Sequence, residues 1–327
     1  MRDSIAPVSA VIAAFNAEEF IGATIASAQA QTLPVAEIVV VADGSTDGTA
    51  KIAASMGVRV FNDDCLGLAR ARNKCVSEST QPWIAFLDSD DLWEPDKIER
   101  QMELAWADPE LGLITCDYAT FSESGNICVS ELEKHAAAYL SQPKRAVPQG
   151  AVIEHLDPHF DSAYYFLLAS NVMVRREVLL RTGLFDESLH SADDFDCFMR
   201  VLAHSPMGLV ERLLVRRRHH DDSTSNRHPA ATLSCLAATY KVLEHPENYP
   251  AATVELCRQW LPGNLRHAGA RLIWNGEPSR GRGLLMESAR LEFNWRTLLA
   301  LTASLPPRAA SRKLMQARYY VSQTLGI

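Results

Sequence analysis

The sequence predicts an α/β protein with a mostly parallel β-sheet flanked by helices, followed by a C-terminal helical region. About the first hundred residues alternate short β-rich runs with helical segments, and this alternation with short links indicates a mostly parallel sheet covered on both faces. Beyond Pro229 the β-rich runs stop and Leu, Ala and Arg dominate, which indicates helices. Hydrophobic residues make up 47% of the chain and charged residues 22%, so the composition is that of a globular protein with a full core.

In the N-terminal part, the expected strands are short β-rich apolar runs and the expected helices have a helical apolar spacing. Helix 18–31, for example, has apolar residues at 20, 21, 25 and 28. The turn 43–48 supplies Asp and Thr side chains that can cap the next helix, and Pro95 favours the first turn of another. The expected strands are 8–14, 37–41, 59–61, 83–87 and 113–118, and the expected helices are 18–31, a segment ending at 56, 67–79 and 95–107.

The middle of the chain predicts less regular structure. Residues 120–165 have mixed polarity and contain Pro143, Pro148 and Pro158, so we expect a long loop region there. Regular structure is expected again in strands 170–175 and 208–218 and in helices 176–182 and 193–203. We therefore divide the chain into an α/β domain at 1–229 and a helical region at 230–327.

The cysteines and the apolar segments bear on location. Seven cysteines are widely spaced, and none forms a Cys-x-x-Cys pair, which predicts free thiols in a reducing compartment. The N-terminus has no long apolar core of a signal peptide, and no apolar run of about 18 residues predicts a membrane span. We expect a cytoplasmic protein, and peripheral contact with the inner face of a membrane stays open.

The charge is unevenly distributed along the chain. The net charge is 32 − 40 = −8, which argues against a general nucleic-acid binder. Residues 230–327 carry 12 Lys and Arg against 6 Asp and Glu, a net of +6. The remaining 1–229 carry 20 against 34, a net of −14. An acidic body therefore precedes a basic tail, and each needs its own explanation.

Three polar clusters directly follow predicted strands. Phe15-Asn16 follows the first, residues 43–45 follow the second, and residues 88–91 follow the fourth. Ligands of open α/β sheets bind beyond the carboxyl ends of the strands, so we expect these clusters to form one site.

The segment Asp88-Ser89-Asp90-Asp91 is the strongest local signal. Three carboxylates so close together repel one another unless a cation neutralises them. Hard cations such as Mg²⁺ and Mn²⁺ accept one or two protein carboxylates and take their other ligands from phosphate and water. The alternative is an acidic cap for the helix after Pro95, with exposed charge. The position of this acidic segment directly after a buried strand favours a metal site.

Several motifs in this order resemble those of family 2 glycosyltransferases, which have the Rossmann-like GT-A fold. The resemblance covers about residues 7–226. Its four principal segments are 8–18, 37–48, 69–73 and 86–91 with Pro95-Asp96, and it continues through 184–187, 193–196 and 218–220. A single motif can match by chance, but chance does not explain matches to all four motifs in the family's order.

The resemblance implies a role for individual residues. Asp90 matches the residue that binds the divalent cation, Mn²⁺ or Mg²⁺, and Asp194 matches the general base. Arg218 and His220, with Ser223 and Ser225, match a loop that closes over the donor diphosphate. Donor-binding roles fall on Ala14, Phe15, Asn16, Asp43, Arg70, Arg72, Asp88, Ser89, Arg218 and His220.

The match has two departures from the family pattern. The family more often has Pro at Ala13 and Tyr at Phe15, where Phe keeps a stacking face but loses the hydroxyl. It usually has Asp where this chain has Ala42, so one acidic contact to the nucleobase is missing beside Asp43.

The resemblance implies a metal-dependent, inverting transfer of a hexosyl group from a nucleotide sugar to an acceptor hydroxyl, in cell-surface polysaccharide or glycolipid synthesis. A UDP-sugar is the favoured donor, and a glycan or a lipid-linked molecule is the acceptor. A carboxylate within hydrogen-bond reach suffices as the base. Asp194, at the start of a helix, is expected to stay ionised near the helix N-terminus.

Other functions account for less of the sequence. A non-catalytic module that binds nucleotide sugars or glycans would not need both Asp90 and Asp194. A nucleotidyltransferase would need a Gly-rich loop with Arg or Lys after the first strand, and residues 15–18 supply none. The same absence of a Gly-x-Gly-x-x-Gly motif disfavours a nicotinamide dehydrogenase.

The basic tail has two interpretations. Residues 258–327 carry 11 Lys and Arg against 3 Asp and Glu, interleaved with aromatic residues such as Trp260, Trp274, Phe293 and Trp295. This composition suits an anionic membrane or a lipid-linked pyrophosphate acceptor. Alternatively, these helices pack on the acidic body or on a second subunit, which leaves a homodimer open.

Overall fold

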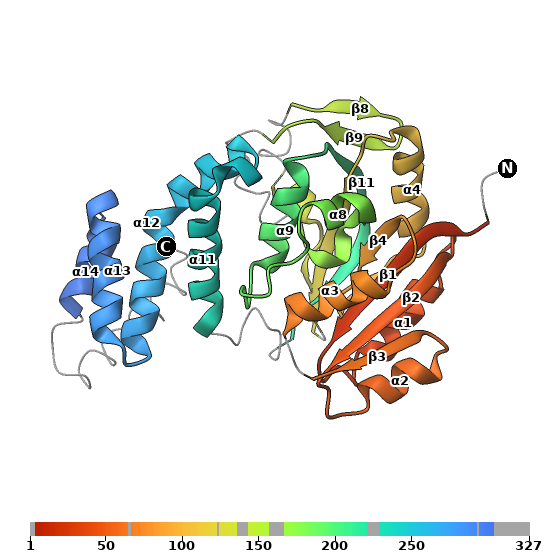
Figure 1. Ribbon diagram of the computed structural model, residues 1–327, viewed down its shortest axis with the longest axis horizontal. Coiled ribbons are helices and arrows are strands. Elements are labelled where there is room, and N and C mark those ends of the chain that lie inside the picture. Colours follow the sequence, from red (N-terminus) through yellow and green to blue (C-terminus); the bar gives the residue numbers. More distant parts are fainter. Residues whose placement is uncertain are drawn as a thin grey trace.

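The computed structural model describes residues 4–64, 67–122, 124–135, 143–156, 167–220, 229–292 and 294–303. Within these residues a sheet of eleven strands forms the centre of an α/β body, and the last four helices, α11 to α14, lie side by side at one end of it (Figure 1). The fold is therefore the predicted one, a sheet flanked by helices with a helical C-terminal region.

The strands are β1 (Ala6–Ala14), β2 (Val35–Asp43), β3 (Arg59–Asp63), β4 (Trp83–Phe86), β5 (Leu92–Trp93), β6 (Leu113–Ser122), β7 (Gly125–Cys128), β8 (Arg145–Val147), β9 (Gly150–Ile153), β10 (Met173–Arg175) and β11 (Met207–Arg218). The helices are α1 (Ile21–Gln29), α2 (Thr49–Ser55), α3 (Leu68–Glu78), α4 (Lys97–Ala107), α5 (Glu131–Lys134), α8 (Arg176–Arg181), α9 (Asp193–Leu202), α11 (Pro229–Glu244), α12 (Ala251–Trp274), α13 (Pro278–Leu291) and α14 (Trp295–Ala303), with short 3₁₀ helices η1 (Ala169–Asn171) and η2 (Pro246–Asn248).

The strand order is β3-β2-β1-β4-β10-β6-β11-β9-β8. The parallel pairing expected from the sequence holds for β3, β2, β1 and β4 and for β6 with β11. The other pairs, including both sides of β10, are antiparallel, so the sheet as a whole is mixed. The carboxyl ends of β1, β2 and β4 meet at one edge, as the three polar clusters require.

The core lies on both faces of this sheet because neighbouring residues of the buried strands point to opposite faces. Val11 and Val39 pack with α3 and α9 on one face. Ile12 and Val40 pack with α1 and α4 on the other. The continuous apolar runs of β1 and β2 are thus explained by burial on both sides.

The expectation of a long loop at 120–165 is wrong for its described part, which contains β7, α5, β8 and β9. Pro148 does not interrupt a strand here: it lies with Gln149 in the tight turn that joins β8 to β9. These strands are only three or four residues long, which is too short to give a clear alternation. Pro158 lies outside the described residues.

The expected strand at 170–175 is also modified, because its first residues form η1 and the strand starts only at Met173. The two-residue strand β5, which pairs with β11 beside the acidic cluster, was not predicted. Each of the other expected strands and helices corresponds to one in the structure.

The C-terminal helices pack closely through glycine. A Cβ atom at Gly269 of α12 would lie 2.7 Å from the carbonyl oxygen of Gly281 in α13, and one at Gly281 would lie 2.5 Å from the carbonyl oxygen of Gly269. Glycine at both positions therefore lets the two backbones touch. None of the helices in the described residues combines the length and the apolar composition needed to cross a membrane, and all six cysteines described are free thiols.

Candidate functional site

The first two strand-end loops are joined by hydrogen bonds. The backbone N–H of Asn16 donates to Ser45 Oγ at 3.1 Å, and the backbone N–H of Thr46 donates to Asn16 Oδ1 at 2.8 Å. The Gly48 N–H donates to Glu18 Oε2 at 2.7 Å. Asn16 has a left-handed φ of 45°, a conformation that Asn tolerates better than most residues. The sequence folds this way because β1 and β2 are parallel neighbours, with Ala14 opposite Ala42.

Two of the predicted nucleobase contacts lie at this junction. Ala14 is buried at the end of β1, and the side chain of the next residue, Phe15, is 55% exposed. Asp43 is buried at the end of β2, and its Oδ2 accepts a hydrogen bond from the Gly67 N–H at 2.9 Å. An exposed aromatic ring and a fixed carboxylate therefore flank the same edge of the sheet.

The acidic turn after β4 is held by residues far away in the sequence. Thr24 Oγ1 donates to the carbonyl oxygens of Ser89 and Asp91, both at 3.0 Å. Ser170 Oγ accepts from the Asp88 N–H at 3.0 Å and donates to Asp91 Oδ2 at 2.6 Å. Asp91 is buried and also accepts from the Arg218 N–H at 2.8 Å. Asp91 therefore stabilises the fold of the turn. Burial and the charges of the nearby Asp90 and Asp88 raise its pKa well above its usual value.

The end of β11 lies against the same turn. His220 Nε2 is 3.0 Å from Asp90 Oδ2, and Arg218 Nε donates to the Asp90 carbonyl oxygen at 3.0 Å. The Arg218 guanidinium lies 4.9 Å from the ring centre of Phe20 and 4.8 Å from that of Phe121. The structure therefore brings together Asp90, Arg218 and His220, which the sequence assigned to one site. Ser223 and Ser225 lie outside the described residues.

Arg72 joins the acidic turn to the start of α9. Its Nη2 is 2.8 Å from Asp88 Oδ1, and its Nη1 is 2.8 Å from Asp193 Oδ2. Burial alone would lower the pKa of Arg72, but the charges of Asp193 and Asp88 raise it. Arg72 therefore acts on the site through its two carboxylate partners. Arg70, two residues earlier in α3, is exposed, so the two arginines proposed for the donor have different surroundings.

Asp194 lies in the first turn of α9, next to Asp193, and is half-buried. Burial, followed by the charge of Asp193, raises the pKa of Asp194 to about 6, against the lowering effect of Arg72. This direction is the opposite of that expected from the helix N-terminus alone. A carboxylate with a pKa of about 6 is still mostly ionised at neutral pH, and it is a stronger base than an ordinary Asp.

The donor set of the acidic turn fits a divalent cation that is shared with a phosphate ligand. Burial and the charge of Asp88 raise the pKa of Asp90, while His220 lowers it, so a bound cation would favour the ionised form of Asp90. No group of three or more His, Cys, Asp or Glu side chains suited to a metal occurs in the described residues. Mg²⁺ and Mn²⁺ bound with phosphates need only one or two carboxylates from the protein, and a single carboxylate such as that of Asp90 fits this requirement.

Sequence reasoning missed Thr24, Ser170 and Phe20, which shape the acidic turn without carrying charge. A Ser or Thr with no motif around it gives no sequence signal for such a role. Trp93, which follows the acidic turn, is 4% exposed and donates through Nε1 to the Ser170 carbonyl oxygen at 2.8 Å. It is therefore a core residue that supports the turn.

The chain is similar in sequence to proteins named as glycosyltransferases. The sequence model of the family "Glycosyl transferase family 2" matches residues 9–160. EpsH of Bacillus subtilis, named as a glycosyltransferase, is 36% identical over 240 residues, which cover 62% of this chain and 67% of EpsH. The Escherichia coli protein WfaP, named as a UDP-Glc:α-D-GlcNAc-diphosphoundecaprenol β-1,3-glucosyltransferase, is 42% identical over 99 residues, which cover 29% of this chain and 39% of WfaP.

The solved structures agree on the fold. TarS 1–349 of S. aureus in complex with UDP-GlcNAc superposes with a TM-score of 0.61 at 16% identity, over 95% of this chain and 92% of TarS 1–349. In four of the curated relatives, the matched part is between 35% and 67% of the relative's length. The motifs, the GT-A fold and the relatives agree, and the chain belongs to glycosyltransferase family 2.

Proposed function

We propose that the protein is a metal-dependent, inverting hexosyltransferase that moves a sugar from a nucleotide-sugar donor to an acceptor hydroxyl. The observation that carries this proposal is the Arg72 bridge between Asp88 and Asp193. The bridge ties the first turn of α9, which carries the proposed base Asp194, to the acidic turn to which we assign the donor diphosphate, and this supports the proposal. The cation that would neutralise the leaving diphosphate and the base that would take the acceptor's proton then belong to one site.

The donor nucleotide would lie over the first two loops. Phe15 offers its exposed ring to the base, and Ala14, Asn16 and Asp43 form the backbone and polar surroundings of that ring. Asp88 and Ser89 follow at the start of the acidic turn, where they would contact the ribose or the sugar. A UDP-sugar remains the favoured donor, since the names of WfaP and of the TarS complex both contain a UDP-sugar.

The diphosphate would lie over Asp90. When bound there, Mn²⁺ or Mg²⁺ supplies Lewis-acid neutralisation of the diphosphate's growing negative charge. Asp90 would hold the cation. The Arg218 guanidinium, which lies against the rings of Phe20 and Phe121, would add positive charge beside it, and His220 would add a hydrogen bond.

Asp194 would accept the proton of the acceptor hydroxyl while that oxygen attacks the anomeric carbon. The bond from the anomeric carbon to the diphosphate oxygen breaks as the new glycosidic bond forms, so a single displacement inverts the configuration. The raised pKa of Asp194 suits this role, because a base of higher pKa takes a proton more readily.

The acceptor and the location belong to the same proposal. We propose a glycan or lipid-linked acceptor in cell-surface polysaccharide synthesis, at the cytoplasmic side of a membrane, in line with the lipid diphosphate in WfaP's name. Residues 258–327 would contact the membrane. Four exposed apolar side chains occur within α13 and α14, and they are Met286, Leu291, Trp295 and Leu298. A homodimer through the same helices is the alternative use of this surface.

The experiment that tests the proposal compares Asp194→Asn with wild type. Thermal shifts with UDP-, GDP- and dTDP-sugars and Mn²⁺ first identify the donor, because a bound ligand raises stability by mass action. Asp194→Asn should keep the donor-induced shift and lose turnover by at least about 10²-fold. Donor binding without any turnover in wild type would instead favour a non-catalytic nucleotide-sugar binding module, and normal turnover in Asp194→Asn would remove Asp194 as the base.

A further inference from the structure

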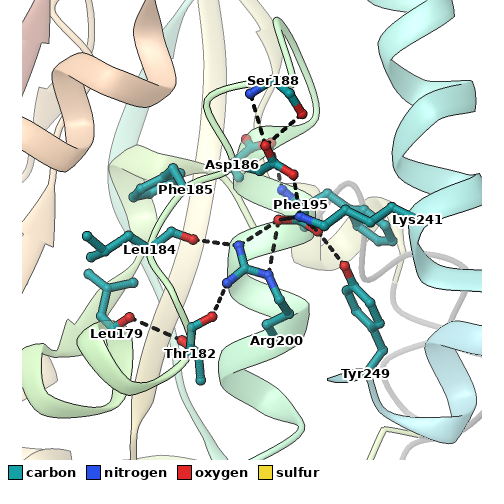
Figure 2. A network of polar contacts seen from close by, with 12 residues as sticks. Leu179, Thr182, Leu184, Phe185, Asp186, Ser188, Phe195, Arg200, Lys241 and Tyr249 are labelled. Atoms are coloured by element: carbon teal, nitrogen blue, oxygen red, sulfur yellow. Dashed lines mark hydrogen bonds and ion pairs between the residues drawn. The ribbon is translucent and has the colours of Figure 1, made fainter. Parts of the chain in front are cut away.

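Asp196, two residues after Asp194 in α9, is a buried carboxylate with partners from three parts of the chain. Its side chain is fully buried. Arg200, one turn further along α9, donates to Asp196 Oδ2 from Nη2 at 2.6 Å. Lys241 Nζ of α11 lies 3.1 Å from the same carboxylate, and the Tyr249 hydroxyl donates to Oδ1 at 2.5 Å (Figure 2). Two of the three partners therefore come from the C-terminal helical region.

The same network reaches the turn before α9. Lys241 Nζ also contacts Asp186 Oδ2 at 2.5 Å, and Asp186 accepts hydrogen bonds from the N–H and the hydroxyl of Ser188. Arg200 donates to the carbonyl oxygens of Thr182 and Leu184 (Figure 2). Lys241 thus links α11 both to α9 and to the segment that leads into α9.

Side-chain contacts between α9 and α12 support the same junction. The Phe195 ring of α9 lies 6.1 Å from the Trp260 ring of α12, centre to centre. The Thr253 hydroxyl of α12 lies 3.3 Å from Met199 Sδ. The C-terminal helices are therefore packed on α9 as well as hydrogen-bonded to it.

The first turn of α9 is consequently held from two sides. Asp193 pairs with Arg72 on the donor side, and Asp196 pairs with Lys241 and Tyr249 on the side of the C-terminal helices. Asp194 lies between these two anchors in the sequence. Because the helix backbone is rigid over a single turn, the position of Asp194 depends on both anchors.

We propose that Lys241 and Tyr249 are positioning residues for Asp194. They act through Asp196 on the α9 backbone and do not themselves touch the reacting atoms. The inference rests on the proposed function, since it gives the C-terminal region a part in orienting the base. A misplacement of about 1 Å in a reacting group costs on the order of 10²-fold in rate, so a small shift of α9 is enough.

The test uses the full chain with Mn²⁺ and UDP-glucose. It measures UDP release as glucose is transferred to water, UDP-glucose affinity by calorimetry, and backbone hydrogen exchange of α9. The variants are Lys241→Met and Tyr249→Phe, and the latter removes only one hydroxyl. Tyr240→Phe is the matched control, because the Tyr240 hydroxyl donates to Glu287 Oε1 at 2.8 Å, within the C-terminal helices. Lys241→Arg tests rescue by a conservative change.

We expect Lys241→Met and Tyr249→Phe to lower kcat at least about tenfold, to leave the UDP-glucose Kd within about twofold, and to speed exchange in residues 193–202. Tyr240→Phe should match wild type and Lys241→Arg should recover most of kcat. Equal kcat losses in Tyr240→Phe, or unchanged kcat in both test variants, would overturn the proposal while leaving the function intact. Should wild type release no UDP, the proposed donor would fall, and hydrogen exchange would then decide the positioning role. Unchanged exchange in residues 193–202 of both variants overturns that role, and faster exchange supports it.

Discussion

The Ser170 hydroxyl donates to Asp91 Oδ2 at 2.6 Å across 79 residues of sequence. Ser170 Oγ also accepts from the Asp88 N–H at 3.0 Å, so one buried side chain binds both ends of the acidic turn. Asp90, the proposed cation ligand, lies between these two contacts. The geometry of the turn is therefore set by Ser170 as much as by the aspartates themselves.

Replacing Ser170 by Ala should weaken the turn. Asp91 would be left buried with one hydrogen bond fewer, which costs about 1–3 kcal/mol of unfolding free energy. The Mn²⁺-dependent affinity for the donor should fall as well, because Asp90 loses its fixed position. Urea denaturation and calorimetry of the donor with and without Mn²⁺ measure the two effects. Ser55→Ala in α2, whose exposed hydroxyl donates to the Ile52 carbonyl oxygen at 2.7 Å, is a control for the loss of a serine hydroxyl. Unchanged donor affinity in Ser170→Ala would argue against a role for Ser170 in the site.

Removing Arg72 should be more damaging than removing Arg70. In Arg72→Met the buried Asp193 loses its ion pair, and breaking a buried pair costs about 3–5 kcal/mol. Turnover should fall on the order of 10²-fold because Asp88 and α9 are no longer tied together. Arg70→Met changes an exposed side chain of the same helix, where stability effects are usually within about 0.5 kcal/mol. Chemical denaturation and steady-state kinetics of the two variants decide the point, and equal behaviour would contradict the bridging role.

The sequence was sufficient for the strands that are buried on both faces and for the acids that follow them. Val39 and Val40 belong to an unbroken apolar run, and such a run predicts a central strand. Asp43, Asp88 and Asp90 follow such runs directly, so their shared edge could be predicted from the general behaviour of parallel sheets.

What the sequence could not provide are the partners. Arg72 and Asp193 are separated by 121 positions, and Lys241 and Asp196 by 45, so no local spacing relates them. The direction of the Asp194 pKa shift was missed for the same reason. The helix N-terminus is visible in the sequence, but the burial of Asp194 and the closeness of Asp193 are consequences of the tertiary fold.

The pH dependence should report on Asp194. Its pKa in the folded protein is about 6, above the usual value of about 4. As a base it works only when ionised, so kcat at saturating donor and Mn²⁺ should fall about tenfold per pH unit below about 6. The folded state also binds this proton more tightly than the unfolded state, so the contribution of Asp194 to stability is greatest below about pH 4 and declines as the pH rises towards 6.

Asp194→Asn separates these two effects. It should remove the decline in stability between about pH 4 and 6, which urea denaturation across that range measures. A kcat profile in wild type that stays flat down to pH 5 would mean that a group with a lower pKa acts as the base.

The membrane contact proposed for the C-terminal helices can be tested by charge reversal. Arg296 and Trp295 are both exposed in α14, so Arg296→Glu alters the surface with little effect on the core. Each basic residue near an anionic bilayer contributes about 1 kcal/mol, so reversal should weaken binding to phosphatidylglycerol vesicles about tenfold or more.

Lys51→Glu, an equal change on the exposed side of α2, should leave binding nearly unchanged. Neutral phosphatidylcholine vesicles should bind neither variant nor wild type appreciably. If Arg296→Glu instead keeps vesicle binding but changes the sedimentation mass of the protein, this surface is an interface between two copies of the chain.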